Sequence, residues 1–146
     1  MKKAFTLIEL LVVLAIIGIL AAMIIASLSG ARARARDAQR KSDLRQIKTA
    51  LEQYYQDNNQ TYPLAAAWEA DLTAGTPSYM RAVPQDPSSA GSYTYSVDAT
   101  QTNYAVQADL ENNNEAITAG VVAGAGGGNG VYEPAAGDKW FQVSND

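Results

Sequence analysis

The chain has 146 residues, a length that fits one domain plus an appendage, and its formal net charge is −4. It contains no cysteine and no histidine, which excludes disulfides, thiolate chemistry and histidine acid–base catalysis. Nine of the 11 basic residues lie at or before Lys48, whereas 12 of the 15 acidic residues follow it, and this asymmetry indicates two regions in different surroundings.

The first predicted element is an apolar helix near the N-terminus. The 20 residues from Leu10 to Ser29 carry no charge, which matches the roughly 20 residues that a helix needs to cross a bilayer. Lys2 and Lys3 precede this run, as in a secretory signal peptide, but the apolar core of such a peptide covers only about 7–15 residues. A cleaved signal peptide and a plain membrane anchor are therefore the two simple alternatives.

Glu9, directly before this run, fits neither alternative well. An acid at the centre of a membrane helix costs about 2.5–3.5 kcal/mol, and less near the end of the span. Nothing in a disposable peptide requires this carboxylate. In a plain anchor Glu9 reaches the lipid headgroups and has no role.

Residues 2 to 63 resemble the N-terminal part of type IV pilins and type II secretion pseudopilins, above all in the block FTLIE followed by a long apolar helix. The resemblance implies that a prepilin peptidase cuts between Ala4 and Phe5 and methylates the new amino group of Phe5. It also implies that the Phe5 amine pairs with Glu9 of a neighbouring subunit during assembly, so that Phe5, Thr6 and Glu9 form the assembly site. Two charges that are each costly in an apolar medium then become cheaper together.

Two positions depart from the family pattern. Ala4 stands where the family usually has glycine, and because alanine is also small we expect cleavage to survive, at a lower rate. Ala26 stands where many members have a proline that favours local unwinding. We therefore expect a more continuous helix, in which Gly18 and Gly30 provide the flexibility.

The next predicted element is a basic, amphipathic helix. Residues 31 to 56 contain no proline or glycine, and Leu44, Ile47, Leu51 and Tyr54 share one helical face. Together with the apolar run they predict one rod from Phe5 to Gln56, about 78 Å long at 1.5 Å per residue. The predicted organisation is a leader at 1–4, a membrane or filament-core half-helix at 5–30, an amphipathic half-helix at 31–57, a loop at 58–91 and a sheet head at 92–146.

Arg32, Arg36 and Arg40 recur every four residues and predict a separate stripe on this helix. Our first interpretation is a solvated face that pairs with acids of neighbouring subunits. Anionic headgroups come second, and nucleic acid comes last because no aromatic residue is interleaved for base stacking. The positive-inside rule would place these arginines in the cytoplasm, whereas the resemblance requires the opposite orientation, which we adopt as the more specific signal.

A loop of about 30 residues follows. Leu64 to Leu72 is a candidate short helix, and SYMRAVPQDP at residues 78–87 resembles the element that precedes the sheet in pseudopilins and short pilins. Its prolines predict a turn that Asp86 can cap.

The remainder predicts a small antiparallel sheet. Alternation around Tyr93–Val97, Tyr104–Ala108 and Trp140–Val143 indicates three strands, and Val121-Val122 is a candidate edge strand. The expected fold class is α+β, with the long helix packed through its Leu44–Tyr54 face against this sheet, as in type IV pilins. GAGGGNG at residues 124–130 is expected to be a flexible connector, since it lacks the lysine and serine or threonine of a phosphate-binding loop.

Metal and catalytic sites receive little support. Asp109, Glu111, Asn112 and Glu115 could gather oxygen ligands for calcium, but a solvated turn is the preferred interpretation, and no other cofactor is expected. Asn59-Gln60-Thr61 fits a glycosylation acceptor, a triplet that also arises by chance. No catalytic constellation is present, so we do not expect an enzyme.

The expected function is a structural subunit that polymerises into a type IV pilus. Its expected partners are further copies of itself, the prepilin peptidase, the inner-membrane assembly platform with its ATPase, and the cytoplasmic membrane before assembly, from which the subunit moves into an extracellular or periplasmic filament. Two alternatives remain open, a pseudopilin that forms a short periplasmic polymer and a membrane-anchored binding domain that never polymerises.

Overall fold

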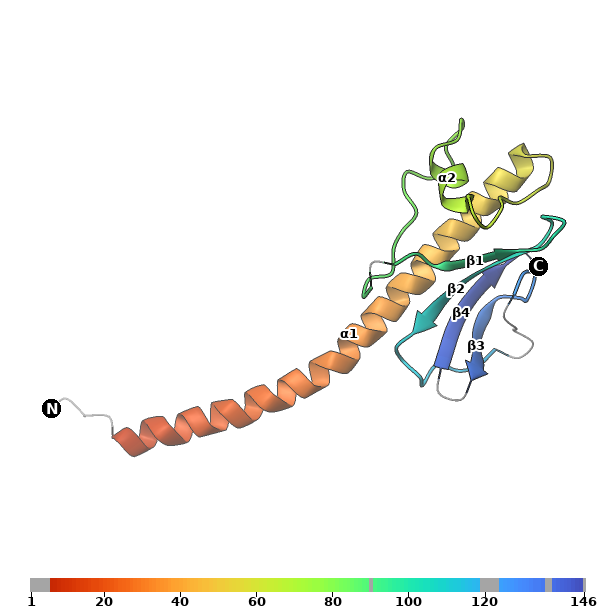
Figure 1. Cartoon of the computed structure of the whole chain (residues 1–146). Helices are drawn as coiled ribbons and strands as arrows, with labels where there is room; N and C mark the ends of the chain where they lie inside the picture. The colour runs from red at the N-terminus through yellow and green to blue at the C-terminus, as the bar shows by residue number, and fades with distance from the viewer. Residues whose placement is uncertain (1–5, 90, 119–123, 136–137, 146) are drawn as a thin grey trace.

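The computed structural model describes residues 6–89, 91–118, 124–135 and 138–145. A single long helix, α1 (Leu7–Asp57), carries a small head beside its second half, and its first half projects away from the head (Figure 1). Its 51 residues correspond to about 76 Å at 1.5 Å per residue. The predicted rod is confirmed. It runs without a break through Gly18, Ala26 and Gly30, and it curves gently along its length (Figure 1).

The helix ends at Asp57, the predicted end of the amphipathic half-helix. Asn58 is the C-cap, and Asn59 and Gln60 both adopt positive φ angles of 54° and 59°, a conformation that stops the helix. The chain then returns along α1 through a loop that holds the short helix α2 (Trp68–Thr73). This helix overlaps the predicted Leu64–Leu72 segment but begins four residues later.

The head is a four-stranded antiparallel sheet of β1 (Thr94–Val97), β2 (Tyr104–Leu110), β3 (Gly130–Ala135) and β4 (Asp138–Ser144), in the order β1-β2-β4-β3. The three predicted strands are confirmed as β1, β2 and β4. Sequence analysis missed β3, whose Pro134 disfavours a central strand but is compatible with the edge that β3 occupies. The candidate strand at Val121-Val122 lies outside the described residues.

The hydrophobic core lies between α1 and the inner face of the sheet. Leu44, Ile47 and Leu51 of α1 are fully buried, and Tyr54 packs against the same cluster, which confirms the predicted helix face. The core is rich in aromatic rings, among which Tyr62 and Tyr104 lie 4.5 Å apart between ring centroids. Burial also raises the pKa of the Tyr104 hydroxyl, which donates a hydrogen bond to Glu52 of α1.

The glycine-rich segment differs from the predicted flexible connector, because its described part is hydrogen-bonded to the sheet. The backbone N–H of Gly126 donates to the carbonyl of Tyr104, and that of Gly128 donates to Ser144 Oγ, both at 3.0 Å. The φ angles of Gly126 and Gly128 are +70° and +90°, so glycine is required by backbone conformation. These bonds bring the segment back to the sheet just before β3 begins.

Candidate functional site

The first half of α1 is an apolar surface that nothing in the described chain covers. Its large apolar side chains, from Leu7 to Leu28, are 43–81% exposed. A contiguous apolar surface of this size marks a contact with membrane or protein. Among the described residues, α1 is the one helix whose length and composition suffice to cross a membrane.

The start of this helix is stabilised by a capping box formed by Thr6 and Glu9. Thr6 is the N-cap in an extended conformation, and its Oγ1 accepts a hydrogen bond from the Glu9 backbone N–H at 3.3 Å. In return, Glu9 Oε2 accepts bonds from the Thr6 backbone N–H at 2.9 Å and from the Thr6 hydroxyl at 2.7 Å. These reciprocal bonds satisfy helix-terminal donors and restrict the Glu9 side chain to one orientation.

The capping box therefore places a carboxylate at the N-terminus of an exposed apolar helix. All of the bonds from Thr6 end on Oε2 of Glu9. A carboxylate in apolar surroundings is stabilised by a cation that completes its hydrogen bonding. Ala4 and Phe5, the predicted processing residues, lie outside the described residues, so their interaction with Glu9 stays a prediction.

Gly18 and Gly30 lie within the continuous helix, where a Cβ at either position would meet no heavy atom within 4 Å. Neither glycine is thus required by packing within the described chain. Their predicted role in flexibility stays a prediction.

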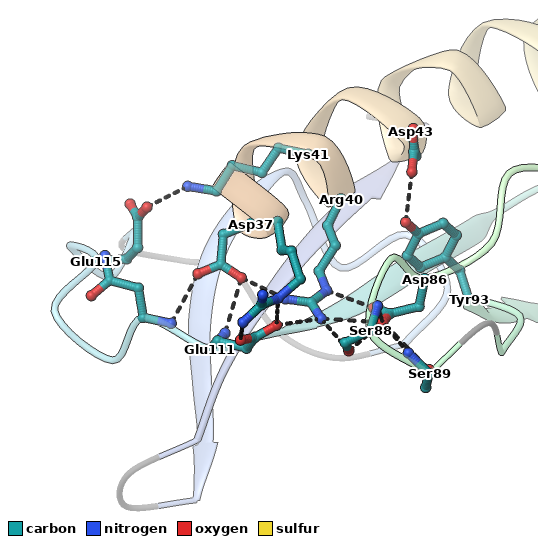
Figure 2. Close-up of polar contacts among 12 residues, drawn as sticks. Asp37, Arg40, Lys41, Asp43, Asp86, Ser88, Ser89, Tyr93, Glu111 and Glu115 are labelled. Carbon is teal, nitrogen blue, oxygen red and sulfur yellow. Dashed lines mark hydrogen bonds and ion pairs between the residues drawn. The ribbon is translucent and has the colours of Figure 1, made fainter. Parts of the chain in front are cut away.

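A second group of polar residues attaches the head to α1 (Figure 2). Arg40, whose side chain is only 3% exposed, contacts three carboxylates. Its Nη1 lies 2.7 Å from Asp37 Oδ1, its Nε lies 2.5 Å from Asp86 Oδ2, and its Nη2 lies 2.8 Å from Glu111 Oε1. The acids come from α1, from the loop before β1 and from the residue directly after β2, so a single guanidinium joins three segments of the chain.

Asp37 completes this connection from the helix side. It is almost fully buried, and its carboxylate accepts the backbone N–H groups of Glu111 at 3.0 Å and Asn112 at 2.9 Å. Asp37 thereby satisfies donors just beyond the end of β2. Asp43 lies six residues after Asp37 on α1, and its carboxylate accepts a hydrogen bond from the Tyr93 hydroxyl at 2.8 Å.

The electrostatics of the group follow from these contacts. The Arg40 guanidinium holds the pKa of the Asp86 carboxyl well below its usual range, because it stabilises the ionised form. Hydrogen bonding to Arg36 lowers the pKa of Glu111 to about 2. Asp86 also accepts the backbone N–H groups of Ser88 and Ser89, which confirms its predicted role as a cap of the turn.

The predicted arginine stripe is wrong in part. Arg32 is exposed, but Arg40 is buried and Arg36 pairs with Glu111 of its own chain. Helical spacing placed the three side chains on one face, but spacing alone does not show where the head begins to cover that face. The i, i+3 pair of Asp37 and Arg40 was the signal in the sequence that could have indicated the ion pair.

The calcium candidates are engaged in other contacts. Glu111 pairs with Arg36 and Arg40, Glu115 pairs with Lys41 at 2.7 Å, and the Asn112 backbone N–H is bound by Asp37. Asp109 is an exposed residue of β2. Within the described ranges, no group of three or more acidic side chains is arranged so that it could hold a metal ion.

Comparison with known proteins adds independent information. Residues 1–25 match the family model described as the prokaryotic N-terminal methylation motif. The chain is 31% identical over 96 residues to a type II secretion system core protein G of Pectobacterium carotovorum subsp. carotovorum, a match that covers 59% of this chain and 62% of that relative. The chain thus spans less than two thirds of the length of this relative.

Two further relatives are pilins by name. A type IV major fimbrial protein FimA of Dichelobacter nodosus is 34% identical over 107 residues, covering 70% of this chain and 69% of the relative. The type IV wide pilus major component PilA4 of Thermus thermophilus is 51% identical over 57 residues, covering 39% of this chain and 44% of the relative. The search of solved structures found no significant match.

Proposed function

This chain belongs to the family of type IV pilins and type II secretion pseudopilins, and from this premise we propose that it is a structural subunit that polymerises through its apolar half-helix into a type IV pilus. The observation that carries the proposal is the uncovered apolar half of α1, which begins at the Thr6–Glu9 capping box. No catalytic role is proposed.

The exposed apolar half-helix restricts the environments in which the subunit is stable. In water, each large apolar side chain that stays exposed forgoes about 1.5–3 kcal/mol of stabilisation relative to its burial. Lipid shields these side chains while the subunit is stored in the cytoplasmic membrane. A subunit that leaves the membrane needs an equally apolar environment, which the half-helices of neighbouring copies provide in a filament core.

Glu9 supplies the specificity of this contact in the proposal. The prepilin peptidase cuts between Ala4 and Phe5, and the new positive amine of Phe5 pairs with Glu9 of a neighbouring subunit. Thr6 supports the pairing because its hydrogen bonds already orient the Glu9 carboxylate. A neighbour in the wrong axial register leaves two unpaired charges in an apolar core, which is strongly unfavourable.

The proposed pathway has three stages. The subunit spans the cytoplasmic membrane once with its head outside, it is cut and methylated at Phe5, and an inner-membrane platform driven by an ATPase adds it to the base of an extracellular filament. The match to the fimbrial protein supports the pilus, because it covers 70% of this chain.

The second candidate is a pseudopilin that forms a short periplasmic polymer. Matches to type II secretion system core protein G from several bacteria favour it, each covering 59% of this chain. The two candidates share processing and helix packing, so they differ in the length and location of the polymer.

The decisive experiment compares native cells with Glu9→Gln cells. Glutamine can keep the capping box because an amide oxygen also accepts hydrogen bonds from the N-cap, so the substitution removes the charge with little change to the helix start. A Thr6→Ser variant, which keeps a capping hydroxyl, is the matched control. The measurements are electron microscopy of sheared surface material and mass spectrometry of the N-terminal peptide.

We expect native and Thr6→Ser cells to yield filaments whose subunits begin at methylated Phe5, and Glu9→Gln cells to retain the subunit in the membrane. Periplasmic polymers without surface fibres would favour the pseudopilin. Normal filaments from Glu9→Gln, or fibres whose subunits begin at Met1, would refute the assembly mechanism. Absence of any polymer from native cells would leave the membrane-anchored binding domain.

A further inference from the structure

The short segment between the apolar half of α1 and the head has an unusual composition. Residues 31–35 read ARARA, directly after Gly30 and directly before the part of α1 that the head contacts. Arg32 and Arg34 are both exposed, and Asp37 is the first residue of α1 that the head buries. We call residues 31–35 the neck. It lies on α1 where the projecting apolar half meets the part of the helix beside the head (Figure 1).

The two neck arginines differ from the next three cations along the helix. Arg36, Arg40 and Lys41 are all paired with acids of the head. Over the part of the chain that the structure describes, neither Arg32 nor Arg34 forms an ion pair. The acids that pair with these three cations are therefore already neutralised within the subunit, and among the described residues the two neck arginines have no acidic partner.

The position of the neck identifies what can neutralise these charges. The uncharged run ends at Ala31, so Arg32 is the first charged residue after the apolar span, about 33 Å along the helix from Leu10. This depth corresponds to the headgroup layer of a bilayer that the span crosses. Arginine binds phosphate oxygens in a bidentate manner, and anionic lipids attract arginines close to the surface.

The spacing of the two arginines defines the geometry of the contact. Residues two apart on an α-helix differ by about 200° in direction, so Arg32 and Arg34 leave opposite sides of α1. Whichever way the helix is rotated about its axis, both guanidinium groups reach the same headgroup layer. The alanine between them and the alanines on either side are small and leave lipid phosphates access to the helix.

We propose that Arg32 and Arg34 form a collar that binds the phosphates of anionic phospholipid headgroups and sets the depth of the unassembled subunit in the outer leaflet. The collar rests on the proposed membrane-spanning first half of α1, but not on polymerisation. It keeps the acidic head at a defined distance above the bilayer, because about 10 Å of helix separates Gly30 from Asp37. Phosphate binding also offsets the cost of placing these arginines outside the cytoplasm, which the positive-inside rule disfavours.

The experiment uses the full chain reconstituted in phosphatidylcholine vesicles that contain phosphatidylglycerol. Electron paramagnetic resonance with spin-labelled phosphatidylglycerol and spin-labelled phosphatidylcholine measures the relative association of the two lipids with the protein. The variants are Arg32→Gln/Arg34→Gln, Arg32→Lys/Arg34→Lys and the control Arg45→Gln. Arg45 is an exposed arginine of the same helix, and it lies about 17 Å beyond Arg34, farther than the screening length of about 8–10 Å at physiological salt.

We expect the native chain to prefer phosphatidylglycerol by up to about five-fold per neck arginine, the equivalent of about 1 kcal/mol each. The preference should fall with added salt, disappear in the double glutamine variant, and persist in the double lysine variant and in Arg45→Gln. Equal association of both lipids with the native chain, or an equal loss in Arg45→Gln, would overturn the collar.

Two controls separate this result from related failures. Protease protection of the reconstituted helix tests insertion for every variant, so a chain that fails to insert counts against the membrane-spanning helix itself. If the double glutamine variant keeps the lipid preference but forms unstable filaments, the neck arginines pair with acids of neighbouring subunits, and the lipid proposal is wrong.

Discussion

Arg40→Met tests whether one buried guanidinium holds the head on α1. Methionine keeps an unbranched chain of similar bulk but removes the charge and every donor. The substitution leaves Asp37, whose side chain is 2% exposed, and Asp86, at 15%, without their shared cation. Asp86 lies in the loop before β1 and Glu111 follows β2, so both contacts by which Arg40 holds these segments on α1 weaken together.

The contacts of the two carboxylates narrow the range expected for the loss in the free energy of unfolding. Removing one partner of a buried ion pair costs about 3–5 kcal/mol, since an uncompensated charge remains. Asp37 keeps the backbone N–H groups of Glu111 and Asn112, and Asp86 keeps those of Ser88 and Ser89. These remaining hydrogen bonds favour the lower end of that range. We therefore expect the free energy of unfolding, which is about 5–15 kcal/mol for a small domain, to fall by about 3 kcal/mol.

The assay is urea unfolding of the full chain in detergent, followed by the fluorescence of Trp68, which lies in α2 and in the hydrophobic core, and of Trp140 in β4. Arg45→Met is the matched control, because Arg45 is exposed on the same helix and should change the free energy of unfolding by less than about 0.5 kcal/mol. A loss below about 1 kcal/mol in Arg40→Met, or an equal loss in the control, would show that packing alone holds the head.

The pH dependence of the same unfolding free energy tests the acids of this group. The folded-state pKa values of Asp86 and Glu111 lie below their ordinary values of 3.8 and 4.5. Their contribution to stability is therefore complete above about pH 4.5 and is lost as the pH falls toward about 2. A constant free energy of unfolding from pH 5 to 2 would contradict the ion pairs. Gly130→Ala should destabilise the head by about 1–3 kcal/mol, because φ at Gly130 is +136° and an added Cβ would lie 2.5 Å from Thr118 Oγ1. Gly124→Ala shares a positive φ of +122° but meets nothing within 4 Å, so in thermal unfolding it should cost less, and equal losses would argue against the Thr118 contact.

Local patterns in the sequence were sufficient for most of the secondary structure. The uninterrupted run from Leu10, the absence of proline from 31 to 56 and the alternation around Tyr104 each depend on neighbouring residues only. The buried helix face of Leu44, Ile47 and Leu51 was predictable for the same reason, since helical spacing brings these side chains together before any tertiary contact forms.

The long-range electrostatics were not predictable in this way. The i, i+3 spacing from Asp37 indicates one ion pair for Arg40, but nothing local shows that Arg40 is buried among three acids whereas Arg32 is exposed. The difference arises because the loop before β1 and the end of β2 both return to α1 at residues 37 to 40. Asp86 and Glu111 are 46 and 71 residues away from Arg40 in sequence, so only the folded chain brings them within hydrogen-bonding distance.

The sequence by itself thus determined a long helix with an apolar first half, an acid at its entrance, and a head built from short strands, because these depend on composition and on the periods of helix and strand. The tertiary structure alone decided that β3 is an edge strand beside β4, that the glycine-rich segment binds back to the sheet, and that the head covers α1 from Asp37 onward. Those outcomes depend on which distant backbone groups and charges satisfy one another, and that competition is settled only when the whole chain is packed.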